Sequence, residues 1–493
     1  MKKTVCLLMI VLMVLSVILC SCNNNSGDAS DDSAAVDPNA YVPHLGATDK
    51  YAGKTLKILA SAGDTADSWH AFCKEALDPD ASTGEPVNDA AYERNQKIKD
   101  CYGITIETIW SAAWTTFIEK VQNDKASGID DYDVIVTGLS TLGTLAAEGF
   151  FADLYSIEGS HLSLDQPWWD VAANEDMSIA NKLYFSTGDI LMMDDENTRC
   201  VVYNIEMLRN NKLESPAQLV RDGEWTLDKF CEMAKTAAVP DSNGNMTHDK
   251  DAIWGSVMAA FDTYTLVVGA NCPMVTKDEN DIPVLAVMEE RNFDAFSQVY
   301  DKVISAVDSC AYTERFTTWS DSTLVDNFAK GQSLFRITTI DVVNSAEIRD
   351  SEVAYGILPV PKLNKEQETY ASAANPYWFQ CIAIKENCKD FDFVTFTLEA
   401  MAWSAREYIT PEYYERTLKN KRALQDDDAA EMLDVLFSNR IVDISIVFNW
   451  DDCIQWYNNC LKTGGAGLSS YVESHQSAFE IQMTDTIDLF LED

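Results

Sequence analysis

The chain has 493 residues, 46% of them hydrophobic, and a formal net charge of −42. This charge argues against nucleic acid and anionic lipid as binding partners, and the hydrophobic content is that of a folded protein. The length is too great for one hydrophobic core and predicts two or more packed units.

The N-terminus has the pattern of an export signal. Lys2 and Lys3 precede an apolar run over residues 5–19, which is short for a membrane span of about 20 residues. Residues 19–22, Leu-Cys-Ser-Cys, resemble the lipobox of bacterial lipoproteins. That resemblance implies a lipoprotein signal peptide over residues 1–21 and a lipidated Cys22, with more than one acyl chain for stable anchoring. The alternative is an ordinary secretory signal with incidental cysteines.

Residues 22–50 are rich in Asn, Ser, Asp and Ala and have few large apolar side chains. Such a segment cannot bury enough surface to order itself, so we expect a flexible acidic tether. The folded part is predicted to begin at Tyr51.

Strand and helix patterns then alternate. Strands are predicted over residues 54–60, 104–110 and 132–137, and helices over 90–99, 115–127 and 142–148. The run 132–137 is almost entirely apolar, which is typical of a parallel strand covered on both faces. The alternation predicts the α/β class.

Residues 182–208 indicate a change from one packed unit to the next. Two short apolar runs, 183–185 and 200–203, surround an acidic centre that contains Asp189, Asp194 and Asp195. We expect strand, hinge and strand here, with ligand-binding groups in the hinge. Asn204 is a predicted N-cap for the helix that follows.

The second half continues as α/β. Helices are predicted over 225–238, 292–310, 324–330 and 390–406, strands over 332–338, 355–361 and 377–384, and mostly helix from 411 onward. The ten cysteines after Cys22 form no Cys-x-x-Cys pair, and only five histidines are present. We therefore predict no metal site, no cofactor and mostly buried thiols.

Several motifs carry a family resemblance through their order and spacing. In the first half they are Asn-Asp-Ala-Ala-Tyr-Glu-Arg-Asn at 88–95, Gly-Phe-Phe-Ala-Asp-Leu at 149–154, residues 181–185, Gly-Asp-Ile at 188–190 and Tyr203-Asn204. In the second half they are Pro216, Trp-Thr-Leu-Asp at 225–228, Gly-Gln-Ser-Leu-Phe at 331–335 and Tyr-Gly-Ile-Leu-Pro-Val-Pro at 355–361. With these motifs the chain resembles the bacterial extracellular solute-binding proteins, family 1-like lipoproteins that serve ATP-driven sugar importers.

The resemblance implies an α/β fold of two lobes, the periplasmic-binding-protein-like type II fold, with an interlobe hinge and a ligand cleft. The crossings between lobes would fall at 187–198 and 374–379. Lobe 1 would comprise residues 51–190 and 376–425. Lobe 2 would comprise 191–375, with a helical part at 426–493 that belongs mostly to it.

A sugar site needs aromatic platforms for C–H faces and carboxylates or hydroxyls for hydrogen bonds. Loops at strand ends and crossings supply such residues, because open α/β sheets bind ligands at their carboxyl ends. The predicted ligand-binding residues are Asp67, Trp69, Ser140, Thr141, Asp189, Asp194, Asp195, Asp341, Tyr377, Trp378 and Trp450. For any one of them a purely structural role is the alternative.

The sequence thus predicts a lipid-anchored binding protein on the extracytoplasmic face of the cell membrane. It would capture a sugar, an oligosaccharide or another small polar solute and pass it to the permease subunits of an ABC importer. We expect a monomer that contacts the membrane only through its lipid. A surface glycan-binding or sensing lipoprotein without a transporter is the alternative. A secreted glycoside hydrolase is less favoured, because no nucleophile motif is present.

Overall fold

The structure is a computed structural model. It describes residues 40–61, 71–111, 114–246, 252–259, 262–309, 312–313, 326–343, 345, 348, 350–418, 428–462 and 467–492. The predicted signal peptide, Cys22, Asp67 and Trp69 lie outside these residues. Within them, no helix is both long and apolar enough to cross a membrane.

Lobe 1 is built on a four-stranded sheet of order β12-β3-β1-β2. The strands β1 (Thr55–Ala60), β2 (Thr105–Trp110) and β3 (Val134–Gly138) are parallel, and β12 (Gln380–Ile384) runs antiparallel to β3. Every residue of β3 is buried, as its apolar run predicts. The helices of this lobe are α2 (Ala71–Leu77), α3 (Pro86–Tyr102), α4 (Phe117–Ser127), α5 (Leu139–Ala146), α6 (Val171–Met177) and α16 (Phe391–Leu418).

Lobe 2 is built on a five-stranded sheet of order β10-β4-β9-β5-β8. Its strands are β4 (Arg199–Asn204), β5 (Trp254–Met258), β8 (Tyr312–Thr313), β9 (Ser333–Thr339) and β10 (Tyr355–Leu358). Its helices are α8 (Ile205–Asn210), α9 (Pro216–Arg221), α10 (Leu227–Ala237), α11 (Asp262–Gly269), α12 (Glu290–Ser309), α14 (Ile340–Val343) and α17 (Ala429–Phe437). A small hairpin, β6 (Val275–Lys277) and β7 (Pro283–Leu285), lies outside this sheet.

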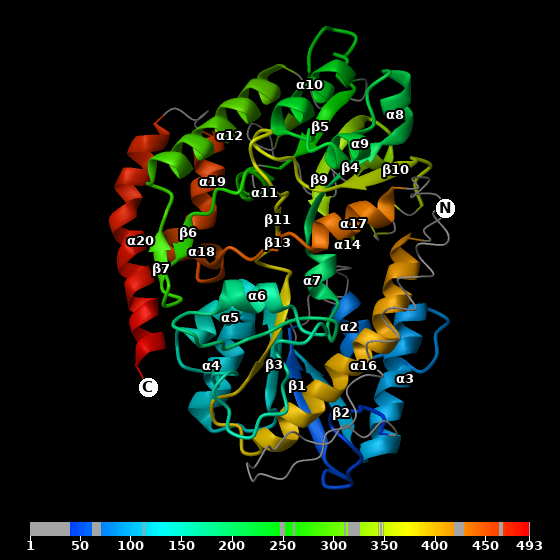
Figure 1. The fold of residues 1–493 in the computed structure, drawn as a ribbon, viewed down its shortest axis with the longest axis vertical. Coiled ribbons are helices and arrows are strands. Elements are labelled where there is room, and N and C mark those ends of the chain that lie inside the picture. Colours follow the sequence, from blue (N-terminus) through cyan, green and yellow to red (C-terminus); the bar gives the residue numbers. More distant parts are fainter. Residues whose placement is uncertain are drawn as a thin grey trace, which may run out of the picture.

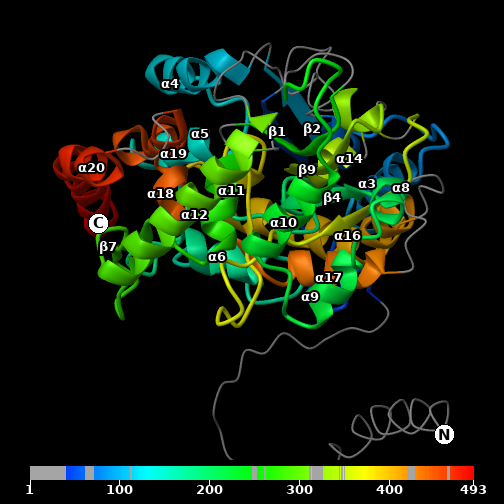
Figure 2. The same cartoon turned by 90° about the horizontal axis from the view of Figure 1, so that it is seen from above.

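The C-terminal part forms α18 (Ile444–Val447), the 3₁₀ turn η4 (Trp450–Asp452), α19 (Cys453–Lys462) and α20 (Leu468–Leu491). Seen from above, these elements gather at one side of the molecule, away from α3 and α8 (Figure 2). Trp456 and Phe479 pack in the core of lobe 2 together with Trp225 and Phe335.

The two lobes have separate cores. Among the described residues, three segments lie together at the junction between the lobes (Figure 1). Two segments are the predicted crossings, which run side by side: Thr198 pairs with Ala374, and the Asn375 N–H donates to the Asn197 carbonyl at 3.0 Å. The third segment, called here the third crossing, lies beside the second one and was not among the two crossings named from the sequence. It contains β13 (Arg440–Ile441), which pairs with β11 (Ser372–Ala373).

Several local predictions are confirmed. Gly103 ends α3 in the left-handed conformation, at φ 68°. The Asn204 side chain caps α8, and the Thr226 side chain caps α10. Five of the described cysteines are buried thiols outside any disulfide: Cys200, Cys231, Cys272, Cys381 and Cys453.

Other local predictions are wrong. Residues 183–185 form no strand. Only their neighbours Lys182 and Ser186 form isolated bridges, with Ile179 and Ile382. Helix α16 does not end at Arg406 but continues through Pro411 to Leu418. Tertiary packing holds this helix together, since it lies along α3 and buries Ile409 and Tyr413.

The tether is also shorter than predicted, because its last part is packed on lobe 1. Val42 is fully buried, and its backbone N–H donates to the Tyr102 hydroxyl at 3.1 Å. The His44 ring stacks on Trp168 and contacts the Glu399 carboxylate at 2.8 Å. Tyr41 and Leu45 also pack on this core, so tertiary contacts order a segment whose composition predicts disorder.

Candidate functional site

The first turn of α5 follows directly from the carboxyl end of β3 and lies against the second crossing. The backbone N–H groups of Leu139 and Ser140 donate to the carbonyls of Phe379 and Pro376, at 3.0 and 3.1 Å. A Cβ on Gly138 would lie 2.1 Å from the Tyr377 carbonyl oxygen, so only glycine permits this approach. Ser140 and Thr141 are half-buried, and the backbone of Ser140 lies against Pro376, next to Tyr377 in the chain.

Tyr377 is an exposed aromatic residue at the end of this crossing, with 41% of its surface accessible. Burial of its hydroxyl raises the pKa of the phenol, and the nearby Asp452 raises it further. Asp452 belongs to η4, which follows α18. Helix α18 packs closely on α5: a Cβ on Gly143 of α5 would lie 2.3 Å from the carbonyl oxygen of Val447 on α18. We call Ser140, Thr141, Tyr377, Trp378 and Asp452 the strand-end cluster.

The turn that carries Asp452 is held in a strained backbone conformation. Asn449, Asp451 and Asp452 all have φ near +49°, a region that Asn and Asp tolerate best among non-glycine residues. The Asp451 N–H donates to Gln482 at 2.7 Å, and its carboxylate contacts His475 at 2.7 Å, so α20 fixes the turn.

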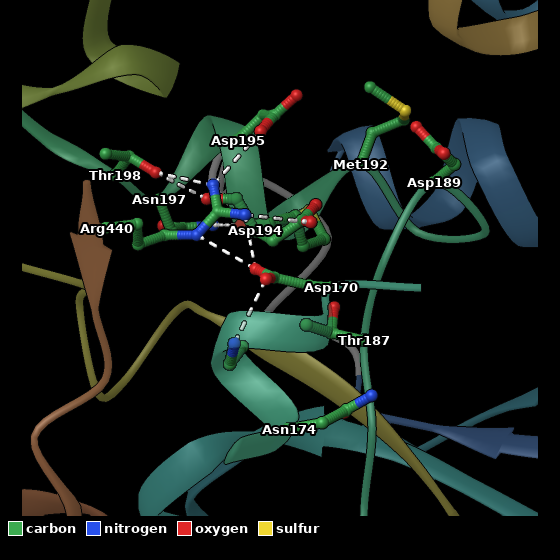
Figure 3. Close-up of polar contacts among 12 residues, drawn as sticks. Asp170, Asn174, Thr187, Asp189, Met192, Asp194, Asp195, Asn197, Thr198 and Arg440 are labelled. Atoms are coloured by element: carbon green, nitrogen blue, oxygen red, sulfur yellow. Dashed lines mark hydrogen bonds and ion pairs between the residues drawn. The ribbon is translucent and has the colours of Figure 1, made fainter. Parts of the chain in front are cut away.

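Asp194 and Asp195 lie on α7 (Met193–Glu196) in the first crossing and bind Arg440 (Figure 3). Arg440 donates to Asp195 at 3.0 Å, to Asp194 at 3.2 Å and to the Thr198 hydroxyl at 3.1 Å. Its Nε also donates to Asp170, the N-cap of α6, at 3.1 Å. Burial raises the pKa of Asp194 and Asp195, and Arg440 opposes that rise. The guanidinium also lies over the ring of Phe379 in the second crossing, 5.7 Å from its centroid. One guanidinium thus joins all three crossings to lobe 1.

Asp189 is likewise buried and engaged. It accepts a hydrogen bond from the Thr410 hydroxyl at 2.6 Å and faces Arg406 at 3.4 Å. Burial raises its pKa to about 7 in spite of these partners. It therefore ties the first crossing to α16.

Asp341 lies at the end of β9, at the start of α14, on the side of lobe 2 next to α7. It accepts a hydrogen bond from the Thr339 hydroxyl. Burial raises its pKa to about 6, and Arg199 and Arg336 lower it in part. Arg199 itself is paired with Asp262.

Trp450 lies in the core of lobe 2, with 1% of its surface accessible. Its indole N–H donates to the Thr486 hydroxyl at 2.8 Å, and its ring stacks on Phe448. In this structure the Trp450 ring and its polar atom are therefore in contact with protein.

The sequence prediction therefore found residues of two places, the strand-end cluster and the hinge, and missed Asp170, Arg440 and Asp452. The only sequence signal for Arg440 was the excess of acidic residues in 189–196, because buried carboxylates need a positively charged partner. That signal does not say which of the distant cations does so.

A family model for bacterial extracellular solute-binding proteins matches residues 90–404. The chain belongs to this family. This match confirms the family resemblance. Solved structures of two-lobed α/β fold align over most of this solute-binding protein, which confirms the fold that the resemblance implies. A comparison with curated proteins gives no match.

Three of these structures differ in the solute that they bind. An ABC substrate-binding protein of Listeria monocytogenes in complex with cycloalternan aligns with a TM-score of 0.53 at 13% identity, over 89% of this chain and 99% of its own. A cyclo/maltodextrin-binding protein complexed with maltotetraose aligns at 0.55 and 14%, over 90% and 98%. A Mycobacterium tuberculosis protein in complex with glycerophosphocholine aligns at 0.57 and 14%, over 82% and 98%. At such low identity the likeness concerns the fold.

Among the described residues, no group of three or more His, Cys, Asp or Glu side chains is arranged to hold a metal ion. The side chains of the strand-end cluster offer aromatic rings for stacking, at Tyr377 and Trp378, and hydroxyls and a carboxylate for hydrogen bonds.

Proposed function

We propose that this protein, anchored by a lipid on Cys22, captures a sugar or oligosaccharide between its lobes and delivers it to an ABC importer. The observation that carries the proposal is the strand-end cluster. Supporting it are an exposed aromatic residue, Tyr377, and two hydroxyl-bearing residues, Ser140 and Thr141, where the end of β3 meets the second crossing.

The cluster offers the interactions that a sugar needs. Tyr377 and Trp378 supply ring faces, each worth about 0.5–1.5 kcal/mol beyond the buried area. Ser140, Thr141 and Asp452 supply hydrogen bonds of about 1 kcal/mol, or more where the carboxylate is charged. Asp341 would contribute from lobe 2. Together such contacts suffice for a micromolar complex, near −8 kcal/mol.

The predicted ligand role of Asp189, Asp194 and Asp195 changes in this proposal. Because they are bonded to Arg440, Arg406 and Thr410, we assign them to positioning of the crossings. Solute would close the lobes only to the extent that it binds the closed arrangement better than the open one.

A polar solute other than a sugar is the second candidate. The Mycobacterium tuberculosis protein with glycerophosphocholine has a similar fold, so the fold is compatible with a phosphodiester headgroup. An enzyme is less favoured, because the family is one of binding proteins and the neighbouring carboxylates Asp194 and Asp195 are both bonded to Arg440.

Thermal unfolding in the presence of single solutes tests the proposal. Maltotetraose, cycloalternan, a broader oligosaccharide panel and glycerophosphocholine would each be added to the purified chain, and hits confirmed by calorimetry. A ligand at 100-fold its Kd adds about 2.7 kcal/mol of stability. Recovery of the ligand unchanged supports binding. Turnover, or stabilisation by no carbohydrate, contradicts the proposal.

A further inference from the structure

Two tight turns, one from each lobe, meet outside the three crossings. The first comprises residues 178–182, between Met177 and Leu183, which both pack in the core of lobe 1. The second joins β6 to β7, and Val275 of β6 packs in the core of lobe 2. Figure 1 shows this hairpin extending from lobe 2 toward lobe 1. We call residues 178–182 and 277–281 together the interlobe clasp.

Asp281 uses all three of its oxygen atoms in the clasp. Its carbonyl accepts from the Ala180 N–H at 2.9 Å, and its Oδ2 accepts from the Asn181 N–H at 3.0 Å. Its Oδ1 accepts from the Lys277 ammonium at 2.9 Å. The two amides belong to lobe 1 and their acceptors to lobe 2. These two bonds therefore depend on how the lobes are arranged.

Lys277 reaches lobe 1 from the same hairpin. Its ammonium donates to the Ser178 hydroxyl at 3.2 Å and to the carbonyl of Glu175 on α6. The side chains of Lys277 and Asp281 are only 19% and 18% accessible, so salt screens this pair less than a surface ion pair. Burial lowers the pKa of Lys277, and Asp281 opposes that shift. One charged pair thus holds donors and acceptors of both lobes in place.

An apolar side chain supports the same arrangement. Ile179 lies only two positions after Met177, a residue of the lobe 1 core, yet it is fully buried in the core of lobe 2. Separation of the lobes would return this side chain to water, which is unfavourable. The burial of Ile179 is therefore a second interaction that favours the observed arrangement.

The clasp keeps this geometry in spite of an unfavourable backbone. Ala180 and Asn181 have φ of 54° and 59°, and Asp281 has φ of 63°. Ile179 and Lys182 exchange backbone hydrogen bonds at 3.1 and 2.9 Å around the first two, as in a two-residue hairpin turn. Asn and Gly are the usual residues of such a turn, and alanine is not. Strained residues persist only where their surroundings fix them, and here these surroundings include the other lobe.

We propose that the interlobe clasp stabilises the lobe arrangement of this structure and that Asp281 is its positioning residue. The effect on solute rests on the proposed function. A solute at the strand-end cluster would contact lobe 1 through Ser140 and the C-terminal part, which packs in lobe 2, through Asp452. Such a solute needs both groups at this spacing, so the affinity follows the fraction of the free chain that has it. The clasp shares no residue with the cluster and acts only on that fraction.

Hydrogen–deuterium exchange of the free chain tests the clasp without any solute. The amides of Ala180 and Asn181 should exchange slowly in the parent chain, because each donates to Asp281. Asp281→Asn should speed exchange at both by about fivefold, since it removes the charge that holds Lys277 and replaces an acceptor oxygen by a donor. Asparagine tolerates the positive φ, so the turn itself is retained.

Glu279→Gln is the matched control, because it removes the same charge from an exposed residue of the same turn. Fast exchange of both amides in the parent chain, or equal exchange in the Asp281 and Glu279 variants, would overturn the proposal. Lys277→Met, which removes the ammonium and keeps the stem, provides the same comparison if circular dichroism shows that Asp281→Asn does not fold.

Scattering and calorimetry separate the clasp from the proposed function. Small-angle X-ray scattering of the free chain should give a larger radius of gyration for Asp281→Asn than for Glu279→Gln. Calorimetry with the solute found by the panel should give about fivefold weaker binding for Asp281→Asn only. An equal radius in the two variants, or equal affinity, would overturn the proposal. A larger radius in Asp281→Asn with no solute found by the panel would support the clasp and contradict the proposed function.

Discussion

The Arg440 guanidinium donates to the Asp195 carboxylate at 3.0 Å, although the two residues are 245 positions apart in the chain. The same guanidinium bonds to Asp194 and to Asp170. A cation from the third crossing thereby neutralises acids of the first crossing and of α6, all of them largely buried.

Replacement of Arg440 by Gln should destabilise the protein by about 3–5 kcal/mol, since it leaves buried carboxylates without their counter-charge. Urea unfolding measures the change. Arg221→Gln is the control, because Arg221 also binds two carboxylates, Asp428 and Glu431, but is more exposed to water. Equal effects of the two substitutions would show that the Arg440 network adds nothing beyond a surface ion pair.

The stability contribution of Asp189 should depend on pH. Burial raises the pKa of its carboxyl to about 7 in the folded chain, whereas the pKa is about 4 in the unfolded chain. Between these values the folded state binds more protons, so this group makes the free energy of unfolding fall as pH rises from about 4 to about 7. Asp189→Asn should therefore flatten the pH profile of urea unfolding over that range. A profile that runs parallel to that of the parent chain would show that Asp189 does not titrate there.

Tyr377→Ala should weaken solute binding by about three- to tenfold, the worth of one stacked ring, and leave thermal stability almost unchanged. Calorimetry with the solute found by the panel measures the affinity. Tyr155→Ala is the control, because Tyr155 is similarly exposed, at 49%, but lies outside the strand-end cluster. If the two variants lose affinity equally, or not at all, Tyr377 does not contact the solute.

Trp450→Ala should give the opposite result. Loss of this buried ring and of its bond to Thr486 should cost about 3–5 kcal/mol of stability, whereas the affinity of the folded fraction stays the same. Urea unfolding and calorimetry below the transition separate the two effects. A loss of affinity without a loss of stability would show that Trp450 contacts the solute.

Cys22→Ser should release the protein from the membrane fraction of the producing cells, because the serine hydroxyl offers no thiol for the lipid. Fractionation followed by immunoblotting measures the distribution. Cys101→Ser is the control, since Cys101 is an exposed thiol within the folded part. Continued membrane association of the Cys22 variant would exclude lipidation as the anchor.

The sequence alone determined the class of the fold and where two of the crossings fall. Apolar periodicity identified β1, β3 and β4, and side-chain chemistry identified the caps at Asn204 and Thr226, because these signals depend on neighbouring residues. It also identified Ser140 and Tyr377 as residues next to strand ends. Only the tertiary structure decided that Asp194 and Asp195 bind Arg440 and that Trp450 is core. It also decided that residues 40–50 are packed and that a third crossing exists. Each of these depends on contacts between residues far apart in the chain, and the pattern of residues around any one position carries no information about which distant partner it will meet.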